Sequence, residues 1–286
     1  MHYIKSLSVR PVAVFRYQSD SLPVGDMDGL AVEEPLEIRV SFRRDGILVS
    51  RPVSITMRTP GLDNELAVGF LFTEGIICSM NSVEALFSER ESSVNVRLSH
   101  QVDLERLNRH FYASSSCGIC GKTSLEAIGL NRSIQLLNGQ PRYSPKFLVR
   151  LPAAVREHQK VFDKTGGLHA AAFFDSRENL IRLSEDVGRH NAVDKVVGAE
   201  LLAGRCGFED LLLFVSGRAG YELVQKSLMA AIPFMAAVGA PSSLSVELAR
   251  RYDSTLVGFL RDQRFNVYSG ASRVKELGSD ANPGLC

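Results

Sequence analysis

Residues 211–260 read LLLFVSGRAGYELVQKSLMAAIPFMAAVGAPSSLSVELARRYDSTLVGFL, and this stretch decides the fold. Three short, mainly apolar runs, LLLFV, FMAAV and TLVGFL, alternate with two segments whose apolar residues recur at helical spacing. Short apolar strands separated by helices of about 10 residues are typical of parallel strands that are covered on both faces. We therefore predict an α/β domain with a mainly parallel sheet over residues 125–275.

The segments before this stretch extend the domain toward the N-terminus. VGRHNAVDKVVGAELLAG, residues 187–204, predicts a helix that ends at Gly204. Two extended runs, residues 167–175 and 179–185, are joined by a polar turn and predict an antiparallel pair. Residues 144–162 show helical periodicity, and Pro152 is expected to kink that helix.

The first hundred residues are rich in strand signals. Residues 36–57 alternate around an Arg-Asp-Gly turn and predict a hairpin. Thr59 and Pro60 resemble a helix start, and the helix should run to Gly75. A strand at residues 93–99 and a short helix at residues 102–111 follow. We therefore predict a smaller N-terminal domain, residues 1–112, a mobile loop, residues 113–124, the α/β domain, and a loose tail, residues 276–286.

Composition excludes several classes of protein. The chain has 286 residues, 45% hydrophobic and 23% charged, with a net charge of +1. That near-neutral charge gives no bulk attraction to nucleic acid or anionic lipid. The longest apolar runs fall far short of the roughly 20 residues that a membrane span needs, and the N-terminus shows no signal-peptide core. We expect a soluble cytoplasmic protein that binds neither nucleic acid nor membrane.

Loops rich in glycine, serine and arginine follow the predicted parallel strands. They are SGRAG, which contains Ser216, Gly217 and Arg218, then GAPSS, residues 239–243, and RDQR, residues 261–264. Ligands of open α/β sheets bind beyond the carboxyl ends of the strands, where backbone amides and arginines can hold phosphate oxygens. We predict a phosphate-bearing ligand there. The alternative is that these residues merely turn the chain.

A second group of polar residues lies around the predicted antiparallel pair and the start of the next helix. Its members are Lys164, Thr165, His169, Glu185, Asp186, Arg189, His190 and Asp194. Either histidine can be a hydrogen-bonded structural residue. Taken together, the group is typical of the lining of a pocket.

Two cysteines stand in SSSCGICGK, residues 114–122, in a chain with five cysteines. A structural zinc site needs four ligands, and no second CxxC is present; Cys78 and Cys206 are expected to be small buried side chains. A thioredoxin-like pair would follow a strand, whereas a serine run precedes this one. The segment also approaches the phosphate-loop pattern GxxxxGK[ST], but Ser116 replaces its first glycine.

A fourth interpretation of Cys117 and Cys120, which competes with the zinc site and the redox pair, is a mobile nucleophile. Thr123 and Glu126 form a capping box, so a helix should begin just after the thiols and lower their pKa, with Lys122 adding to the effect. The surrounding glycines and serines offer no packing surface, which suits a loop that moves between a donor and an acceptor. A persulfide is one cargo that such a thiolate can carry.

Seven stretches, taken in order, resemble the formate dehydrogenase accessory sulfurtransferase family, often written FdhD. The likeness covers about residues 35–270, and the conjunction of motifs is far more specific than the CxxC alone. The stretches are TPGLDNELAVGFLFTEGII, SSCGICGK, TGGLHAAAFFD, DVGRHNAVDKVVG, VSGRAGYELVQKSLMAAIP, APSSLSVELA and TLVGFLRDQRFNVYS.

The resemblance implies a function. Proteins of this family carry sulfur from a cysteine desulfurase to the molybdenum or tungsten bis(guanine dinucleotide) cofactor that formate dehydrogenase requires. It implies that Cys117 carries the persulfide, that Cys120 is its partner, and that the chain is a homodimer. It also implies cofactor binding by FLRDQR, which is Phe259, Leu260, Arg261, Asp262, Gln263 and Arg264. From the strand-end argument we add Ser216, Gly217, Arg218 and His169, and we expect no permanently bound cofactor or metal.

The family's larger domain is similar to the cytidine deaminase fold, which raises a second hypothesis. A zinc deaminase uses H-x-E followed later by P-C-x-x-C. Here Ala171 stands where the glutamate would be, and the CxxC precedes His169. Deamination is therefore disfavoured. A third hypothesis is a chaperone that holds the cofactor without sulfur chemistry, and its activity would survive loss of both thiols.

Overall fold

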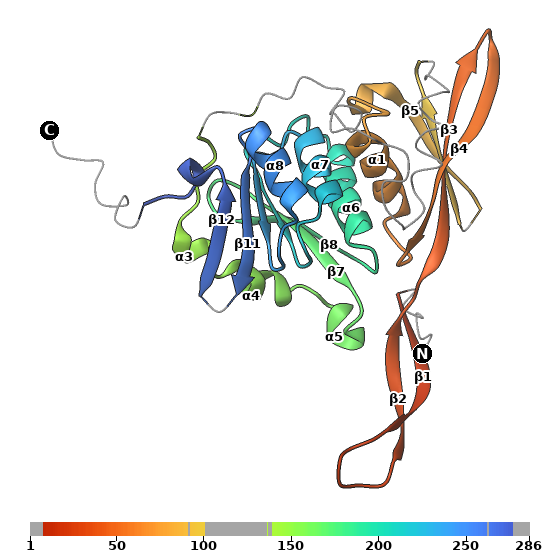
Figure 1. The fold of residues 1–286 in the computed structure, drawn as a ribbon. Helices are drawn as coiled ribbons and strands as arrows, with labels where there is room; N and C mark the ends of the chain where they lie inside the picture. The colour runs from red at the N-terminus through yellow and green to blue at the C-terminus, as the bar shows by residue number, and fades with distance from the viewer. Residues whose placement is uncertain (1–7, 91, 101–135, 137–138, 262, 277–286) are drawn as a thin grey trace, which may run out of the picture.

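A computed structural model describes residues 8–90, 92–100, 136, 139–261 and 263–276. In these ranges the chain forms a six-stranded sheet, a four-stranded sheet and a two-stranded arm. The six-stranded sheet and its helices form the main body, the four-stranded sheet lies beyond α1, and the arm projects away from both (Figure 1).

The six-stranded sheet has the order β12-β11-β10-β9-β7-β8. β9, β10 and β11 are mutually parallel, as expected. β12 pairs antiparallel with β11, and β7 pairs antiparallel with both β9 and β8. The sheet is therefore mixed and less parallel than predicted, because short hairpin turns add β12 and β8. Its strands are β7 (His169–Phe174), β8 (Leu180–Asp186), β9 (Leu212–Val215), β10 (Phe234–Ala237), β11 (Thr255–Arg261) and β12 (Arg264–Ser269).

Helices cover both faces of this sheet (Figure 1). Alternate strand residues such as Phe173, Leu213 and Met235 share one apolar cluster with α6 (Arg189–Leu202), α7 (Tyr221–Met229) and α8 (Ser243–Arg251). Residues of the opposite parity, such as Phe214, share a second cluster with α3 (Pro145–Leu148) and α4 (Leu151–Arg156). This double burial explains why the strands are apolar along their whole length.

The four-stranded sheet has the order β4-β3-β6-β5. Its inner side chains, such as Ile38 and Val94, belong to the same apolar cluster as α6 and β9. Helix α1 (Asp63–Thr73) lies between this sheet and α6, and it is buried on most sides. The strands are β3 (Glu34–Arg44), β4 (Ile47–Arg58), β5 (Val83–Arg90) and β6 (Ser93–Leu98), and the 3-10 helix η1 (Met80–Ser82) precedes β5.

Helices α1 and α6 approach each other at two glycines. A Cβ atom added at Gly69 would lie 1.8 Å from the carbonyl oxygen of Asp194, and one added at Gly198 would lie 1.8 Å from that of Glu65. No side chain fits at either position, so the two backbones touch directly. This contact holds the N-terminal sheet and α1 against the main body.

Strands β1 (Val9–Arg16) and β2 (Val24–Ala31) pair only with each other among the described strands and form the arm. At its base, Gly29 lies against the carbonyl of Lys164 in α5 (Phe162–Thr165), where an added Cβ would be 2.8 Å from the oxygen. The 3-10 helix η2 (Ala271–Arg273) follows β12. None of the helices in the described ranges is long and apolar enough to cross a membrane.

Two local predictions are wrong. α1 begins at Asp63 after Leu62 in a left-handed conformation, and Thr59 does not cap it because its side chain and amide bond to Val187 and Asp186 instead. Residues 144–162 do not form one kinked helix but contain α3, α4 and the start of α5. The hairpins at residues 36–57 and 167–185 and the helix ending before Gly204 are confirmed. The predicted helix at residues 102–111 lies outside the described residues, and the domain boundaries stay predictions.

Candidate ligand-binding site

The carboxyl ends of β9, β10 and β11 meet at one edge of the six-stranded sheet. Because β7 is antiparallel to β9, His169 at the start of β7 lies at this same edge. Ser216, which follows β9, joins the two: its Oγ accepts a hydrogen bond from the Ala170 amide at 2.8 Å, and its own amide donates to the Ala170 carbonyl at 2.9 Å. His169 and the Ser216 loop are therefore held side by side.

Backbone hydrogen bonds link the loops that follow β9 and β10 to the carboxyl-terminal part of β11. The amide of Gly239 donates to the carbonyl of Gly217 at 2.9 Å, and the amide of Phe259 donates to the carbonyl of Gly239 at 3.2 Å. A Cβ atom at Gly239 would lie 2.9 Å from the Cα atom of Arg218, so only glycine allows this approach. The two loops and the end of β11 are therefore joined.

The β11–β12 hairpin supplies the basic end of this edge. Arg261 and Arg264 face each other across the turn, so RDQR is a hairpin turn and not a loop that leaves the sheet. A hollow of about 240 Å³ is lined by Phe259, Arg261, Arg264 and Asn266. The Arg261 guanidinium carbon lies 5.7 Å from the centre of the Phe259 ring. Leu260 is buried in the core, and Asp262 lies outside the described residues.

Charged side chains gather at the His169 end of the same edge. Burial lowers the pKa of His169, and the nearby Arg189 guanidinium and His190 add to that effect. His190 Nε2 lies 2.9 Å from Glu222 Oε2, and this hydrogen bond lowers the pKa of the Glu222 carboxyl. His169 is therefore held neutral near pH 7, with one ring nitrogen able to donate a hydrogen bond.

Four arginines at this edge have guanidinium donor atoms that can bind an anion. Within the described ranges, Arg218, Arg261 and Arg264 are exposed and form no ion pair with a carboxylate. The Nε atom of Arg189 is buried and has no hydrogen-bond partner there. α6 and α7 begin at the same edge, at Arg189 and Tyr221, with glycine before each and no side-chain cap. Free helix amides and guanidinium groups both favour phosphate oxygens.

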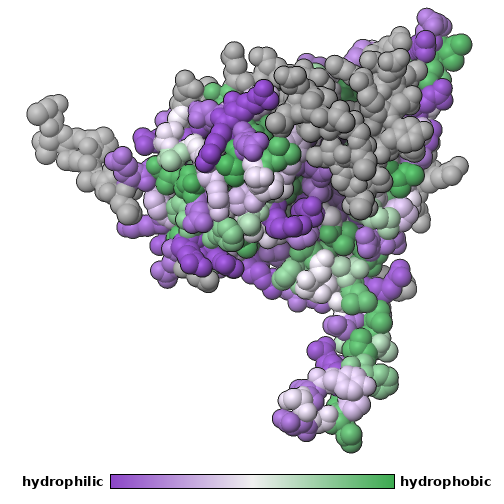
Figure 2. All heavy atoms as spheres, in the orientation of Figure 1, coloured by the Kyte–Doolittle hydropathy of each residue, from purple (hydrophilic) through white to green (hydrophobic). Residues whose placement is uncertain are grey.

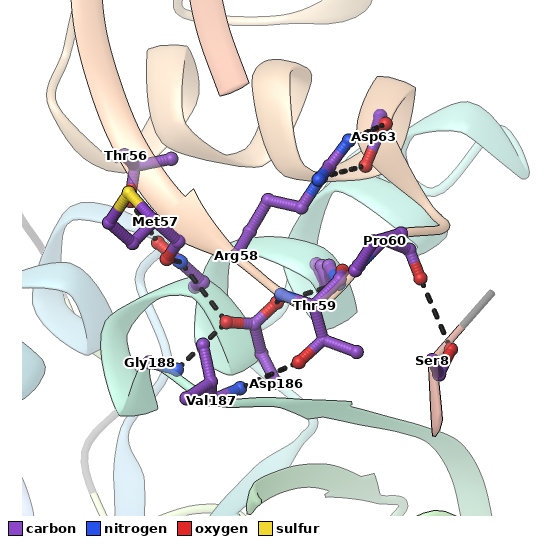
Figure 3. Close-up of polar contacts among 12 residues, drawn as sticks. Ser8, Thr56, Met57, Arg58, Thr59, Pro60, Asp63, Asp186, Val187 and Gly188 are labelled. Carbon is purple, nitrogen blue, oxygen red and sulfur yellow. Dashed lines mark hydrogen bonds and ion pairs between the residues drawn. The ribbon is translucent and has the colours of Figure 1, made fainter. Parts of the chain in front are cut away.

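Asp186, at the carboxyl end of β8, fixes the segment that presents Arg189 and His190. Its carboxylate lies 2.7 Å from Lys195 Nζ and accepts hydrogen bonds from the amides of Thr59 and Gly188 at 3.1 and 2.8 Å (Figure 3). Lys195 also donates to the Thr59 carbonyl at 2.7 Å. Asp186 and Lys195 are 0% and 2% exposed, so this pair is shielded from solvent. The network joins the end of β4 to the start of α6.

The residues of the predicted polar group therefore lie at several different places in the fold. Glu185 accepts hydrogen bonds from the amides of Val161 and Phe162 and so holds the start of α5. Asp194 pairs with Lys226 at 3.0 Å between α1, α6 and α7. His169, Arg189 and His190 stay together at the sheet edge. Lys195 and Glu222 were not predicted; the available signal for Lys195 was the charged pair Asp194–Lys195 within an otherwise apolar stretch.

The cysteines considered in the sequence fall into two pairs, of which the structure describes one. Cys117 and Cys120 lie outside the described residues, and their roles stay predictions. Cys78 and Cys206 are exposed, which contradicts the expected burial, because each stands in a surface turn next to a helix end. Among the described residues, no three His, Cys, Asp or Glu side chains are grouped so as to hold a metal ion.

A mixed sheet between helical layers, with arginines and helix N-termini gathered at the ends of its parallel strands, defines an α/β protein whose strand-end edge is a candidate ligand site. Comparison with known proteins gives its family. A sequence model of the FdhD/NarQ family matches residues 31–275. The chain belongs to this family.

Individual relatives match over most of their length. The chain is 45% identical over 259 residues to "Sulfur carrier protein FdhD" of Streptomyces avermitilis, covering 86% of this chain and 89% of that protein. It is 40% identical over 268 residues to the protein of the same name from Sulfolobus acidocaldarius, covering 94% and 99%. A crystal structure of a candidate formate dehydrogenase accessory protein from Desulfotalea psychrophila matches with a TM-score of 0.71 at 20% identity, covering 94% of this chain and 100% of that one. At that identity the match shows the fold.

Proposed function

We propose that this protein is a sulfur carrier in the maturation of formate dehydrogenase. The observation that carries the proposal is its membership of the FdhD/NarQ family, together with relatives named sulfur carrier proteins that match nearly end to end. The donor is a cysteine desulfurase, and the acceptor is the molybdenum or tungsten bis(guanine dinucleotide) cofactor before its insertion into formate dehydrogenase. Free thiols require a reducing compartment, so we place the reaction in the cytoplasm.

The proposed reaction begins with a persulfide exchange. The Cys117 thiolate attacks the outer sulfur of the desulfurase persulfide, a new S–S bond forms, and the desulfurase cysteine leaves as a thiolate. In the second step, the Cys120 thiolate attacks the inner sulfur of the Cys117 persulfide. That step closes a Cys117–Cys120 disulfide and expels hydrosulfide, which the acceptor takes up. A cellular dithiol then supplies the two electrons that reopen the disulfide.

The acceptor binds along the strand-end edge in this proposal. Its pyrophosphates suit the arginines and the helix N-termini there, and a guanine ring can stack on Phe259 within the hollow formed with Arg261 and Arg264. The groups assigned to the substrate are Phe259, Arg261, Arg264, Ser216, Gly217, Arg218 and His169. Neutral His169 and the half-buried Arg189 would contact the phosphate end.

We further propose that the α/β layers are related to the cytidine deaminase fold. The support is topological: an antiparallel hairpin, β7–β8, is followed by three parallel strands, each reached through a helix, within one sheet that helices cover on both faces. Ala171 still stands at the position where a deaminase would carry its glutamate. The proposal therefore concerns ancestry of the fold and does not include deamination.

The test is transfer of sulfur from a cysteine desulfurase and free cysteine, read by intact-protein mass spectrometry. We expect the parent to gain the mass of one sulfur atom and Cys117→Ala to gain none. Cys206→Ala is the matched control, because it removes an exposed thiol elsewhere and should be labelled like the parent. Equal labelling of Cys117→Ala would refute the assigned nucleophile. Formate dehydrogenase activation by a variant without both thiols would favour a cofactor-holding chaperone.

A further inference from the structure

Phe259 stands at a bulge in β11 that takes its side chain out of the regular alternation of the strand. The pairing with β12 shifts register between Gly258 and Arg261, and Phe259 has a φ of 51°, in the left-handed region. Val257 and Leu260 share one apolar cluster, although residues three apart in a regular strand point to opposite faces. A left-handed conformation is unfavourable for a bulky residue, so the surrounding structure must maintain it. The bulge leaves Phe259 at the hollow.

Gly258 allows two neighbouring groups to approach β11 beside this hollow. It pairs directly with Asn266 of β12, so the two residues share a face of the hairpin. A Cβ atom at Gly258 would lie 2.9 Å from Cδ of Pro241 and 3.2 Å from Cε2 of Tyr268. Glycine is therefore needed for this approach, and the contact fixes the place of the Tyr268 ring next to Asn266.

Asn266 lines the hollow with its side-chain amide held in one orientation. Its Nδ2 donates to the hydroxyl oxygen of Tyr268 at 3.3 Å, which directs Oδ1 away from Tyr268. In the part of the chain that the structure describes, this Oδ1 has no hydrogen-bond partner. Arg264, Asn266 and Tyr268 alternate along β12 and share a face, so the acceptor lies on the same face as a guanidinium group. Figure 2 shows hydrophilic spheres at the lower end of the main body, where Figure 1 places the turn of this hairpin.

We propose that Asn266 determines base specificity at this edge: its Oδ1 accepts a hydrogen bond from the N–H groups on the edge of a guanine ring that stacks on Phe259. Guanine carries N–H donors at N1 and at its 2-amino group. Adenine has an unprotonated N1 and a C2–H at these positions, which offer an acceptor oxygen no donor. Tyr268 is a positioning residue, because it orients the Asn266 amide. This inference rests on the proposed function for the presence of a guanine nucleotide at the edge.

The test is isothermal titration calorimetry of the full chain with GDP, ADP and inorganic pyrophosphate. We expect the parent to bind GDP at least about tenfold more tightly than ADP. Asn266→Leu keeps the size of the side chain and removes both polar atoms, so this preference should fall at least about fivefold, while the affinity for pyrophosphate stays the same. Asn266→Asp retains an acceptor and should keep the preference for GDP.

Two further variants separate base recognition from general damage to the hairpin. Tyr268→Phe should lower the preference for GDP less than Asn266→Leu does, because Oδ1 remains but is no longer oriented. Val267→Ala is the matched control, because Val267 lies between these residues on the opposite face of β12, and it should leave the preference unchanged.

Three results with a parent that binds nucleotide would each overturn the proposal. They are equal binding of GDP and ADP by the parent, the parent's preference in Asn266→Leu, and an equal loss of preference in Val267→Ala. A parent that binds neither nucleotide would overturn it as well. Sulfur labelling of Cys117 needs no nucleotide, so that experiment decides the proposed function separately.

Discussion

The buried network around Asp186, which we call the Asp186 junction, and the β11–β12 hairpin both contain charged side chains. The two regions differ in whether those charges have partners within the protein. Asp186 is fully buried, and its two carboxylate oxygens meet Lys195 and amide donors from the residue after β4, from α6 and from the residue before α6. Arg261 and Arg264 are exposed, and neither forms an ion pair within the described part of the chain. In the first region, the hydrogen-bonding and ion-pairing capacity of the Asp186 carboxylate is taken up by other groups of the protein. The second region leaves such capacity unused within the described residues, which supports its proposed role in binding.

This difference separates residues that position the site from residues that bind. A buried carboxylate with every lone pair engaged cannot contact a substrate without losing a bond to the fold. Unpaired arginines beside an aromatic ring cost little to leave in water and gain most when an anion arrives. Substitutions at the junction should therefore lower stability, whereas substitutions at the hairpin should lower affinity and leave stability nearly unchanged.

The strongest test of the comparison is Asp186→Ala. It leaves the Lys195 ammonium buried and unpaired, and we expect the free energy of unfolding to fall by about 3–5 kcal/mol. The measurement is urea denaturation followed by circular dichroism. Asp210→Ala is the control, because its carboxylate is 60% exposed and pairs with Arg205, and it should cost about 0–1 kcal/mol. Similar losses for the two variants would abolish the distinction between junction and surface.

Gly69→Ala tests whether the α1–α6 contact belongs to the same rigid junction. The added methyl would meet the Asp194 carbonyl at 1.8 Å, so the helices must separate, and we expect a loss of about 3 kcal/mol in the same denaturation experiment. At Gly25 an added Cβ has only the Phe15 ring near it, at 3.9 Å, and Gly25→Ala should change stability little. If Gly69→Ala proved as stable as the parent, the direct backbone contact would be disproved.

Arg264→Ala tests the binding half of the comparison. We expect the affinity for GDP, used as a stand-in for the guanine dinucleotide, to weaken by about 1.5–3 kcal/mol, because one charged hydrogen bond is lost. Isothermal titration calorimetry measures the affinity, and urea denaturation should show nearly unchanged stability. Arg177→Ala removes another exposed arginine at the opposite edge of the sheet and should bind GDP like the parent. Unchanged affinity in Arg264→Ala would move the nucleotide site elsewhere.

The smallest expected effect is the change of stability with pH that is due to His169. Its pKa in the folded protein is below the ordinary value of 6.5, so between these two values the unfolded chain binds more protons. Stability due to this group is therefore unaffected above pH 6.5 and falls as the pH decreases below it. His169→Gln should lose less stability than the parent between pH 7.5 and pH 5.5, measured by urea denaturation. His158→Gln, at an exposed histidine, should follow the parent.

Local sequence signals predicted most of the elements in the main body. The apolar runs at 211–260 became β9, β10 and β11, because strands buried on both faces admit no polar positions. Thr59 shows where such signals fail. Its pattern is that of a helix cap, but Asp186, 127 positions along the chain, takes its amide. A contact at that separation leaves no local trace.

The candidate site was predictable in part for the same reason. The strand-end rule located Ser216, Gly217 and Arg218 beside His169, because chain direction alone decides which ends meet. It did not predict that Leu260, within the FLRDQR motif, faces the core, because alternation along a strand is visible only once the strand's bounds are known. It also missed β12 and the arm, whose alternating face becomes informative only with the pairing register.

The hydrogen bonds among Gly217, Gly239 and Phe259 use main-chain atoms alone. An insertion or deletion in either of the two loops would shift the other loop and the end of β11, whereas exchange of an exposed side chain would not. Relatives that bind different ligands should therefore differ here in their exposed side chains and keep the same loop lengths. A redesign for a different ligand should likewise exchange exposed side chains and leave the loop lengths unchanged.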